Sequence, residues 1–146
     1  MNFTLKKVNR ENWDLLLEWR NNIETQNMSI VNRPVSKSEH FKYQTKIELN
    51  KDIEQYMFIH NNLYVGTIKA EYLNNKHTTL SYTINPEFRG KGYGKLMMHL
   101  FLFERNGLFL CKVKETNFAS IRMCEWNDFK LKSKKDSILL YEKNIK

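Results

Sequence analysis

The turn at residues 89–94, Arg-Gly-Lys-Gly-Tyr-Gly, limits the folds open to this 146-residue chain more than any other segment. It joins a strand-like run at residues 80–84 to an amphipathic helical run at residues 95–104. Glycine adopts backbone angles that other residues avoid and lets the main chain approach a ligand closely. The N–H groups that begin the following helix have no partners within it. The sequence therefore predicts a strand, a tight turn and a helix whose N-terminus binds an anion such as phosphate.

Three basic residues, Arg89, Lys91 and Lys95, surround this turn. They lie at the positive end of a helix dipole, where acidic residues are normally favoured, and a bound anion would remove that conflict. The alternative is that the glycines only close a turn in a chain that is rich in lysine and arginine. The spacing fits neither a P-loop nor a dinucleotide-binding fingerprint in an early βαβ unit.

The turn resembles the R-x-x-G-x-G pyrophosphate loop of the GNAT superfamily of N-acetyltransferases, and residues 82–88 resemble that family's approach to the loop. The resemblance implies an acyl-coenzyme A site with acetyl-CoA as co-substrate and no metal. The cofactor-binding residues that it implies in this part of the chain are Ile84, Arg89, Gly90, Lys91, Gly92, Tyr93, Gly94 and Lys95.

Hydrophobic periodicity and turn residues predict seven strands and four helices. The strands are expected at residues 3–8, 55–60, 64–72, 77–84, 108–114, 129–132 and 137–144. The helices are expected at residues 11–21, 95–104 and 118–126, and from a capping box at Ser36 and Glu39 towards Glu48, with a polar loop at residues 22–34. This order matches the GNAT fold, an α/β (α+β mixed) fold with a central mixed, mostly antiparallel sheet of about seven strands and about four helices, in a single domain at residues 1–146. The helix after the glycine turn should join two neighbouring parallel strands.

Composition limits the function classes without choosing among them. A hydrophobic content of 41% suits one globular core, and the net charge of +8 would attract an anionic ligand of any kind. The lysines at residues 132–135 would suit a nucleic-acid-binding module, but no helix-turn-helix, zinc or RNA-binding motif accompanies them. Two cysteines give neither a disulfide framework nor zinc-ligand spacing, and no apolar run reads as a signal core or bilayer span. We therefore expect a cytoplasmic protein whose partners include neither nucleic acid nor a membrane.

Residues 117–129 resemble the family's N-x-x-A-x-x-x-Y-x-x-x-G-F segment, with Asp128 in place of the usual glycine. Asn117 matches the position that contacts the cofactor in the family, and it also suits a helix N-cap. Cys124 occupies the position where many members carry a tyrosine that protonates the departing coenzyme A thiolate. A thiol with a pKa of about 8.5 can donate a proton, so Cys124 is a candidate catalytic acid. The alternatives are a small buried apolar residue, or a nucleophile, for which no basic neighbour lies nearby in sequence.

The resemblance implies direct attack by an amine on the thioester, whose carbonyl is polarised by a backbone N–H near an irregular end of the strand at residues 80–84. The family's frequent glutamate on this strand is Thr79 here, so no base is obvious. Candidates are Tyr82, Glu71 and His40, although Tyr82 also suits the core, Glu71 also suits a solvated strand position, and a water chain would serve as well. We take Tyr82 and Cys124 as the candidate catalytic pair.

The segment Trp19-Arg20-Asn21 and the later His40 resemble a branch of the superfamily that acetylates amino groups of nucleotide-linked sugars, including the pseudaminic acid pathway. That branch grades into ribosomal-protein and aminoglycoside acetyltransferases. Arg20 could pair with a diphosphate or carboxylate, or only complete a helix end, and Trp19 suits packing. The expected substrate-binding residues are Arg20, His40 and Glu71, and the expected partner is a small-molecule amine. A protein N-terminus, another small amine, or a catalytically weak acetyl-CoA-binding protein are the alternatives, and pairing of the final strands could support a homodimer.

Overall fold

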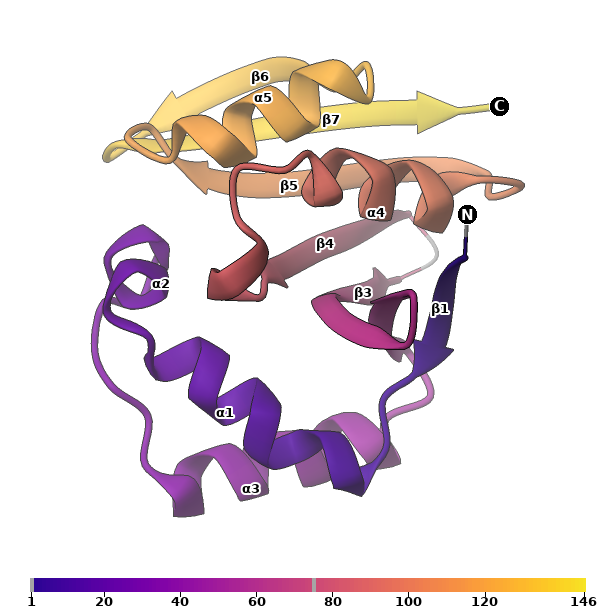
Figure 1. Cartoon of the computed structure of the whole chain (residues 1–146). Helices are drawn as coiled ribbons and strands as arrows, with labels where there is room; N and C mark the ends of the chain where they lie inside the picture. Colours follow the sequence, from indigo (N-terminus) through magenta and orange to yellow (C-terminus); the bar gives the residue numbers. More distant parts are fainter. Residues whose placement is uncertain (1, 75) are drawn as a thin grey trace.

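Seven strands form one sheet in the order β1-β2-β3-β4-β5-β7-β6 (Figure 1). The structure is a computed structural model that describes residues 2–74 and 76–146, so the first residue of the predicted domain and Asn75 lie outside the described residues. The strands are β1 (Phe3–Lys7), β2 (Ile53–His60), β3 (Leu63–Leu73), β4 (His77–Ile84), β5 (Gly107–Lys114), β6 (Lys130–Lys135) and β7 (Ile138–Ile145). Among the described residues, β4 and β5 are the only strands that pair in parallel, which confirms the mixed, mostly antiparallel sheet and the crossover after the glycine turn.

Five α-helices occur in the part of the chain that the structure describes, against about four expected. They are α1 (Trp13–Asn21), α2 (Ile23–Met28), α3 (Lys37–Leu49), α4 (Tyr93–Leu102) and α5 (Phe118–Trp126), with 3₁₀ turns η1 (Arg10–Asn12) and η2 (Pro86–Phe88). The predicted capping box is present, since Ser36 accepts from the Glu39 backbone and the Glu39 side chain accepts from the Ser36 backbone.

The prediction of a polar loop at residues 22–34 is wrong over its first part, which forms α2. The Asn22 side chain accepts hydrogen bonds from the backbone N–H groups of Glu24 and Thr25 and so begins this helix. The helix is only 6 residues long and has two apolar residues, Ile23 and Met28, so it carries no hydrophobic periodicity that a sequence pattern could reveal.

The sheet is covered on both faces, and neighbouring residues of β2 take part in the two cores. Phe58 packs in the larger core with Met97 and Phe101 of α4, whereas Met57 packs with Leu16 and Trp19 of α1. Alternation along a strand sends these two side chains to opposite faces. Figure 1 shows α1, α2 and α3 gathered at one end of the molecule and α5, β6 and β7 at the other.

The final strand β7 lies inside the sheet rather than at its edge, and the support of a homodimer by pairing of the final strands stays a prediction. β7 is hydrogen-bonded to β5 along one side and to β6 along the other. The outer strand at this end is β6, which is exposed along its whole length and has the sequence Lys-Leu-Lys-Ser-Lys-Lys. Lysines on an edge strand oppose pairing with a second copy.

No helix among residues 2–74 and 76–146 is long and apolar enough to cross a membrane.

Candidate active site

The sheet opens between β4 and β5, because their pairing ends before either strand does. Leu80 with Cys111 is the last pair, although β4 continues to Ile84 and β5 to Lys114. A cavity of about 1150 Å³ occupies this opening and reaches both faces of the sheet. Its lining includes Tyr82 and Ile84 on the face covered by α4 and α5, and Ser81 and Thr83 on the opposite face. This size is enough for a cofactor arm and an acceptor together.

The glycine turn lies at the mouth of this cavity and has the backbone that its sequence predicts. Gly90 and Gly92 have φ angles of +77° and +81°, and a Cβ added at either would meet nothing within 4 Å. Gly92 is the N-cap of α4 and no side chain caps that helix end. The first N–H groups of α4 therefore face the cavity mouth without a side-chain partner, as an anion site requires.

Gly94 serves the turn in a different way from the other two glycines. It lies within α4, and an added Cβ would come within 2.7 Å of the Met123 sulfur on α5. The absent side chain allows α4 and α5 to approach closely beside the cavity. Lys95 lines the cavity, whereas Lys91 extends over the Phe88 ring, 5.8 Å from its centroid, outside the lining.

Arg89 points from the glycine turn to α2. Its Nη1 lies 3.3 Å from a carboxylate oxygen of Glu24, and its Nη2 donates to the Thr25 hydroxyl. The partners are 65 and 64 residues away in sequence. Arg89 thus already has an anionic partner, which a bound phosphate would have to replace or share.

Asn117 begins α5 and lines the cavity opposite the glycine turn. Its side-chain oxygen accepts from the Ser120 backbone N–H at 3.2 Å, so the helix-cap role is present. Its amide nitrogen remains able to donate toward the cavity.

The two candidate catalytic residues lie together, but only one of them reaches the cavity. The Tyr82 hydroxyl is 3.5 Å from the Cys124 sulfur and accepts a hydrogen bond from the Ser120 hydroxyl at 3.1 Å. Tyr82 and Ser120 line the cavity, whereas Cys124 has no exposed surface and is absent from the lining. Burial raises the pKa of Tyr82 well above its ordinary value, which removes it as a general base at neutral pH. The neighbouring Cys111 thiol lowers the pKa of Cys124.

The predicted irregular end of β4 is not present in the structure. β4 pairs with β3 without a register shift through Gly66 and Ile84, and the irregularity falls between Phe58 and Ile59 of β2 instead. A backbone donor for the thioester carbonyl would therefore come from a regular strand that has lost its β5 neighbour.

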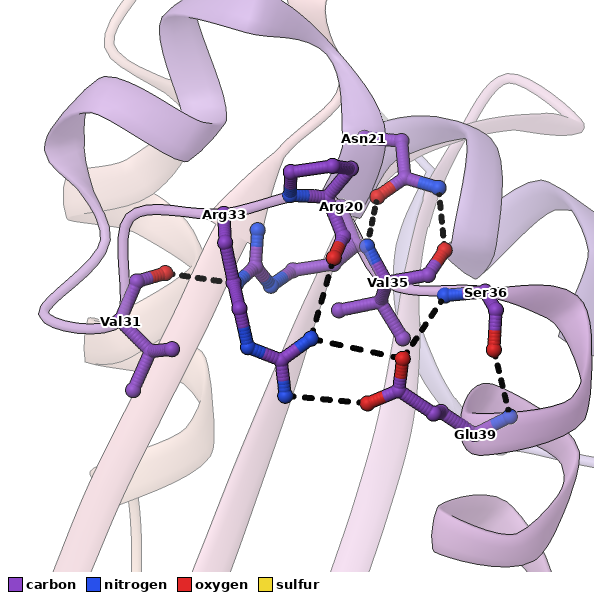
Figure 2. A network of polar contacts seen from close by, with 8 residues as sticks. Arg20, Asn21, Val31, Arg33, Val35, Ser36 and Glu39 are labelled. Carbon is purple, nitrogen blue, oxygen red and sulfur yellow. Dashed lines mark hydrogen bonds and ion pairs between the residues drawn. The ribbon is translucent and has the colours of Figure 1, made fainter.

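Arg20, at the end of α1, reaches the cavity from the other face of the sheet. Its Nη2 donates to the Val31 carbonyl at 2.7 Å, and its Nη1 is buried with no hydrogen-bond partner among the described residues. Burial, followed by the charge of Arg33, lowers the pKa of Arg20. Figure 2 shows the surrounding network, in which Arg33 pairs with Glu39 at 3.0 Å. Because Glu39 is taken by Arg33, Arg20 keeps an unused donor beside the cavity.

The other two expected substrate-binding residues are placed less favourably. His40 lines the cavity, but its Nε2 donates to the Trp13 carbonyl at 2.8 Å, and burial lowers its pKa. Glu71 does not line the cavity and pairs across the sheet with Ile53 and Thr79. The structure therefore brings Arg20 and His40 to the cavity and leaves Glu71 outside it.

Sequence reasoning missed a row of polar residues on β2 and β3. Gln55 and Lys69 lie opposite each other in the strand register and both line the cavity. The Gln55 side-chain oxygen is buried with no partner among the described residues, and Lys69 donates to the Tyr43 hydroxyl of α3. Polar residues that alternate with Ile68 and Ala70 on a central strand were the available signal.

Basic side chains outnumber acidic ones in the cavity wall. Its two carboxylates are Glu24 and Glu39, which already pair with Arg89 and Arg33. Eight cationic side chains line it: Arg20, Arg33, Lys69, Arg89, Lys95, Lys112, Lys114 and Arg122. Within the described ranges, no group of three or more His, Cys, Asp and Glu residues is arranged to hold a metal ion.

Residues 2–130 match the family described as acetyltransferase (GNAT) domain. This match covers most of the chain, and the chain belongs to that family. It is therefore an acyl-CoA-dependent N-acetyltransferase that uses acetyl-CoA. No curated protein matched the sequence.

Solved structures with the same fold are distant in sequence. A domain from Methanocaldococcus jannaschii is 20% identical, with a TM-score of 0.86 over 99% of each chain. The Campylobacter jejuni N-acetyltransferase PseH in complex with acetyl coenzyme A is 15% identical, with a TM-score of 0.75 over 98% of this chain and 99% of that one. An aminoglycoside acetyltransferase in complex with coenzyme A is 14% identical, with a TM-score of 0.79 over 98% of this chain and 95% of that one. At these identities the likeness extends to the fold and not to the acceptor.

Proposed function

We propose that this protein acetylates a primary amine on an anionic small molecule, and that the acceptor is a nucleotide-linked amino sugar. The observation that carries the proposal is the surplus of cations in the cavity, whose two carboxylates are both paired with arginines. A cationic wall favours an anionic ligand and disfavours a polycation such as an aminoglycoside.

The cofactor alone does not account for this surplus. The pyrophosphate of acetyl-CoA would occupy the N-terminus of α4, where Arg89 and Lys95 lie. Arg20 and Lys69 line the cavity from α1 and β3 on the other face of the sheet, where a second anion would contact them. The Arg20 Nη1 is a buried donor with no partner among the described residues, and a diphosphate offers several oxygen acceptors to the planar guanidinium.

The cofactor-binding set that we propose is the one implied by the sequence: Ile84, Arg89, Gly90, Lys91, Gly92, Tyr93, Gly94, Lys95 and Asn117. Within it, the open positive-φ positions Gly90 and Gly92 let the backbone approach phosphate oxygens. The acceptor amine attacks the acetyl carbon directly in a ternary complex, the C–N bond forms, and the C–S bond breaks to release coenzyme A. We expect the reaction to take place in the cytoplasm.

Two alternative functions would use the same cavity. A protein N-terminus could enter the same cavity, and the basic wall would then select an acidic N-terminal segment. A catalytically weak acetyl-CoA-binding protein would fit Thr79 at the family's glutamate position and Cys124 at its tyrosine position.

The test is the release of coenzyme A thiol from acetyl-CoA with matched pairs of acceptors. Each UDP- or dTDP-linked amino sugar is compared with the same amino sugar without its nucleotide, and an aminoglycoside and acidic and basic N-terminal peptides serve as controls. We expect turnover with a nucleotide-linked sugar and at least about tenfold lower kcat/KM without the diphosphate, which corresponds to one lost charge-assisted hydrogen bond. Turnover that prefers the aminoglycoside, or binding of acetyl-CoA without turnover on any amine, would overturn the proposal.

A further inference from the structure

Among the β4 residues on the face covered by α5, Tyr82 is the first that pairs with β3 but has no β5 partner on its other side. The last β4–β5 pair is Leu80 with Cys111, and Tyr82 follows Leu80 two residues later on the same face. Its hydroxyl extends to α5, where it meets Ser120 and Cys124. A cofactor arm entering from the glycine turn between β4 and α5 would pass Tyr82, which lines the cavity.

The hydrogen bonds around the phenol leave its own proton available. Ser120 donates to the Tyr82 oxygen at 3.1 Å, so the phenol already accepts one bond there. The remaining partner is the Cys124 sulfur at 3.5 Å, and a neutral sulfur is a weak acceptor. A thiolate is a much stronger acceptor, so the phenol proton would turn to it readily.

Cys124 is a poor candidate for the same task, although it occupies the family's tyrosine position. Its side chain is fully buried and lies behind Tyr82 and Ser120, outside the cavity lining. Cysteine is also several atoms shorter than tyrosine. The phenol that the family supplies from this helix position is therefore missing, and the Tyr82 hydroxyl lies 3.5 Å from the sulfur of the residue that replaces it.

We propose that Tyr82 is a catalytic residue that donates a proton to the departing sulfur of coenzyme A, with Ser120 as the residue that positions it. This inference deepens the proposed function and rests on it. When the amine nitrogen bonds to the acetyl carbon, the C–S bond breaks and its electron pair goes to sulfur. The phenol proton passes to that sulfur, and the nitrogen, which carries one proton too many after attack, returns a proton to the phenol.

The step leaves Tyr82 unchanged and needs no carboxylate base. One proton moves from nitrogen to sulfur, and the products are an amide and a thiol. The raised pKa of Tyr82 keeps the phenol protonated before the reaction. The absence of an unpaired carboxylate from the described cavity lining fits this arrangement.

The first test uses binding and needs no acceptor. Coenzyme A and acetyl-CoA affinities are measured by calorimetry between pH 7 and 9 for the wild type, Tyr82→Phe, Ser120→Ala and Cys124→Ala. The ratio of the two affinities isolates the thiol, because the phosphates are common to both ligands. A phenol that donates to sulfur stabilises the bound thiolate and so lowers the pKa of the bound coenzyme A thiol. In the wild type, the affinity for coenzyme A relative to acetyl-CoA should therefore rise with pH, by up to about tenfold for each unit by which the thiol pKa is lowered.

We expect this shift to vanish in Tyr82→Phe and to persist in Cys124→Ala. A Phe variant that keeps the shift, or a Cys124→Ala variant that loses it, would overturn the assignment. Failure of the wild type to bind either ligand would instead overturn the proposed function itself. With an acceptor in hand, Tyr82→Phe should lower kcat by about a hundredfold with little change in the KM for acetyl-CoA, Ser120→Ala by a few-fold, and Cys124→Ala by less than about tenfold.

Discussion

Replacing Arg20 by methionine should stabilise the protein while weakening its hold on an anionic acceptor. The Arg20 Nη1 is buried with no partner among the described residues, which costs about 1–3 kcal/mol. The bond from Nη2 to the Val31 carbonyl is exposed to solvent and contributes only about 1 kcal/mol in the opposite sense. Methionine keeps most of the apolar stem and carries no donor. The free energy of unfolding should therefore rise by about 0–2 kcal/mol, and the Tm by about 3 °C for each kcal/mol.

The effect on function should have the opposite sign. Loss of a charge-assisted hydrogen bond costs about 1.5–3 kcal/mol, which corresponds to a roughly 10- to 150-fold weaker affinity. UDP alone is the probe, measured by calorimetry in the presence of saturating acetyl-CoA, and acetyl-CoA affinity itself should not change. The two readouts come from one substitution, so a general loss of structure cannot produce both.

Arg33→Met is the matched control. Arg33 also lines the cavity, but it is 56% exposed and both of its guanidinium nitrogens that meet Glu39 are satisfied. A surface ion pair of this kind contributes about 0–1 kcal/mol to stability. The Tm of Arg33→Met should therefore stay level or fall slightly, and its affinity for UDP should change less than that of Arg20→Met. A clear fall in Tm for Arg20→Met, or UDP affinity equal to the wild type, would refute the reasoning.

Three further substitutions test separate parts of the site. Gly92→Glu should abolish acetyl-CoA binding because it places a carboxylate at the anion site. It should leave the circular dichroism spectrum intact, because the left-handed backbone strain at this position costs only about 1–2 kcal/mol. Unchanged acetyl-CoA affinity in the folded variant would contradict the placement of the phosphate. Glu24→Gln should release Arg89 and so raise acetyl-CoA affinity up to about fivefold at low salt, and high salt should remove this gain. If the variant and the wild type bind acetyl-CoA equally at low salt, phosphate does not recruit Arg89. Burial lowers the pKa of His40 in the folded state, so below about pH 6.5 the unfolded state binds more protons than the folded state. The free energy of unfolding of the wild type should therefore fall as the pH drops, and His40→Gln should remove this loss. Urea unfolding at pH 7.5 and 5.5, with His99→Gln as an exposed control, measures it, and equal pH dependence in the wild type and His40→Gln would count against a buried neutral histidine.

Local patterns predicted most of the fold. The alternation in β4, the capping box at Ser36 and the glycine turn before α4 each lie within a few residues of one another, and each formed as expected. The short helix α2 was missed because its 6 residues include only two apolar ones, which are too few to set a periodicity. The position of β7 between β5 and β6 was missed, because it depends on which edge of the sheet β6 joins. No local sequence pattern determines this choice.

The site was predicted unevenly for the same reason. The glycine turn carries its own geometry, so its positive-φ positions followed from the residues alone. The exclusion of Cys124 from the cavity and of Glu71 from its lining depended on packing between elements, which a motif position does not report. Lys69 and Gln55 were missed because alternating polar residues on a strand normally indicate a solvated face, and only α1 and α3 turn that face into a cavity wall.

The segment from Asn22 to Val35 is the part of the site that sequence reasoning was least able to define, because its partners are far away in sequence. Arg89 of the glycine turn contacts it through Glu24, Lys114 of β5 donates to the Asn27 carbonyl, and Arg20 donates to the Val31 carbonyl. One short stretch is therefore held both by the turn that would bind phosphate and by the arginine that would bind the acceptor. If a phosphate replaces Glu24 as the partner of Arg89, the segment loses its ion pair to the glycine turn. It keeps its hydrogen bond to Arg20 on the acceptor side. Linkage requires that acetyl-CoA change the affinity for the acceptor by the same factor by which the acceptor changes the affinity for acetyl-CoA. Glu24→Gln removes the Glu24–Arg89 ion pair before any ligand binds, so it should reduce these two effects by the same factor.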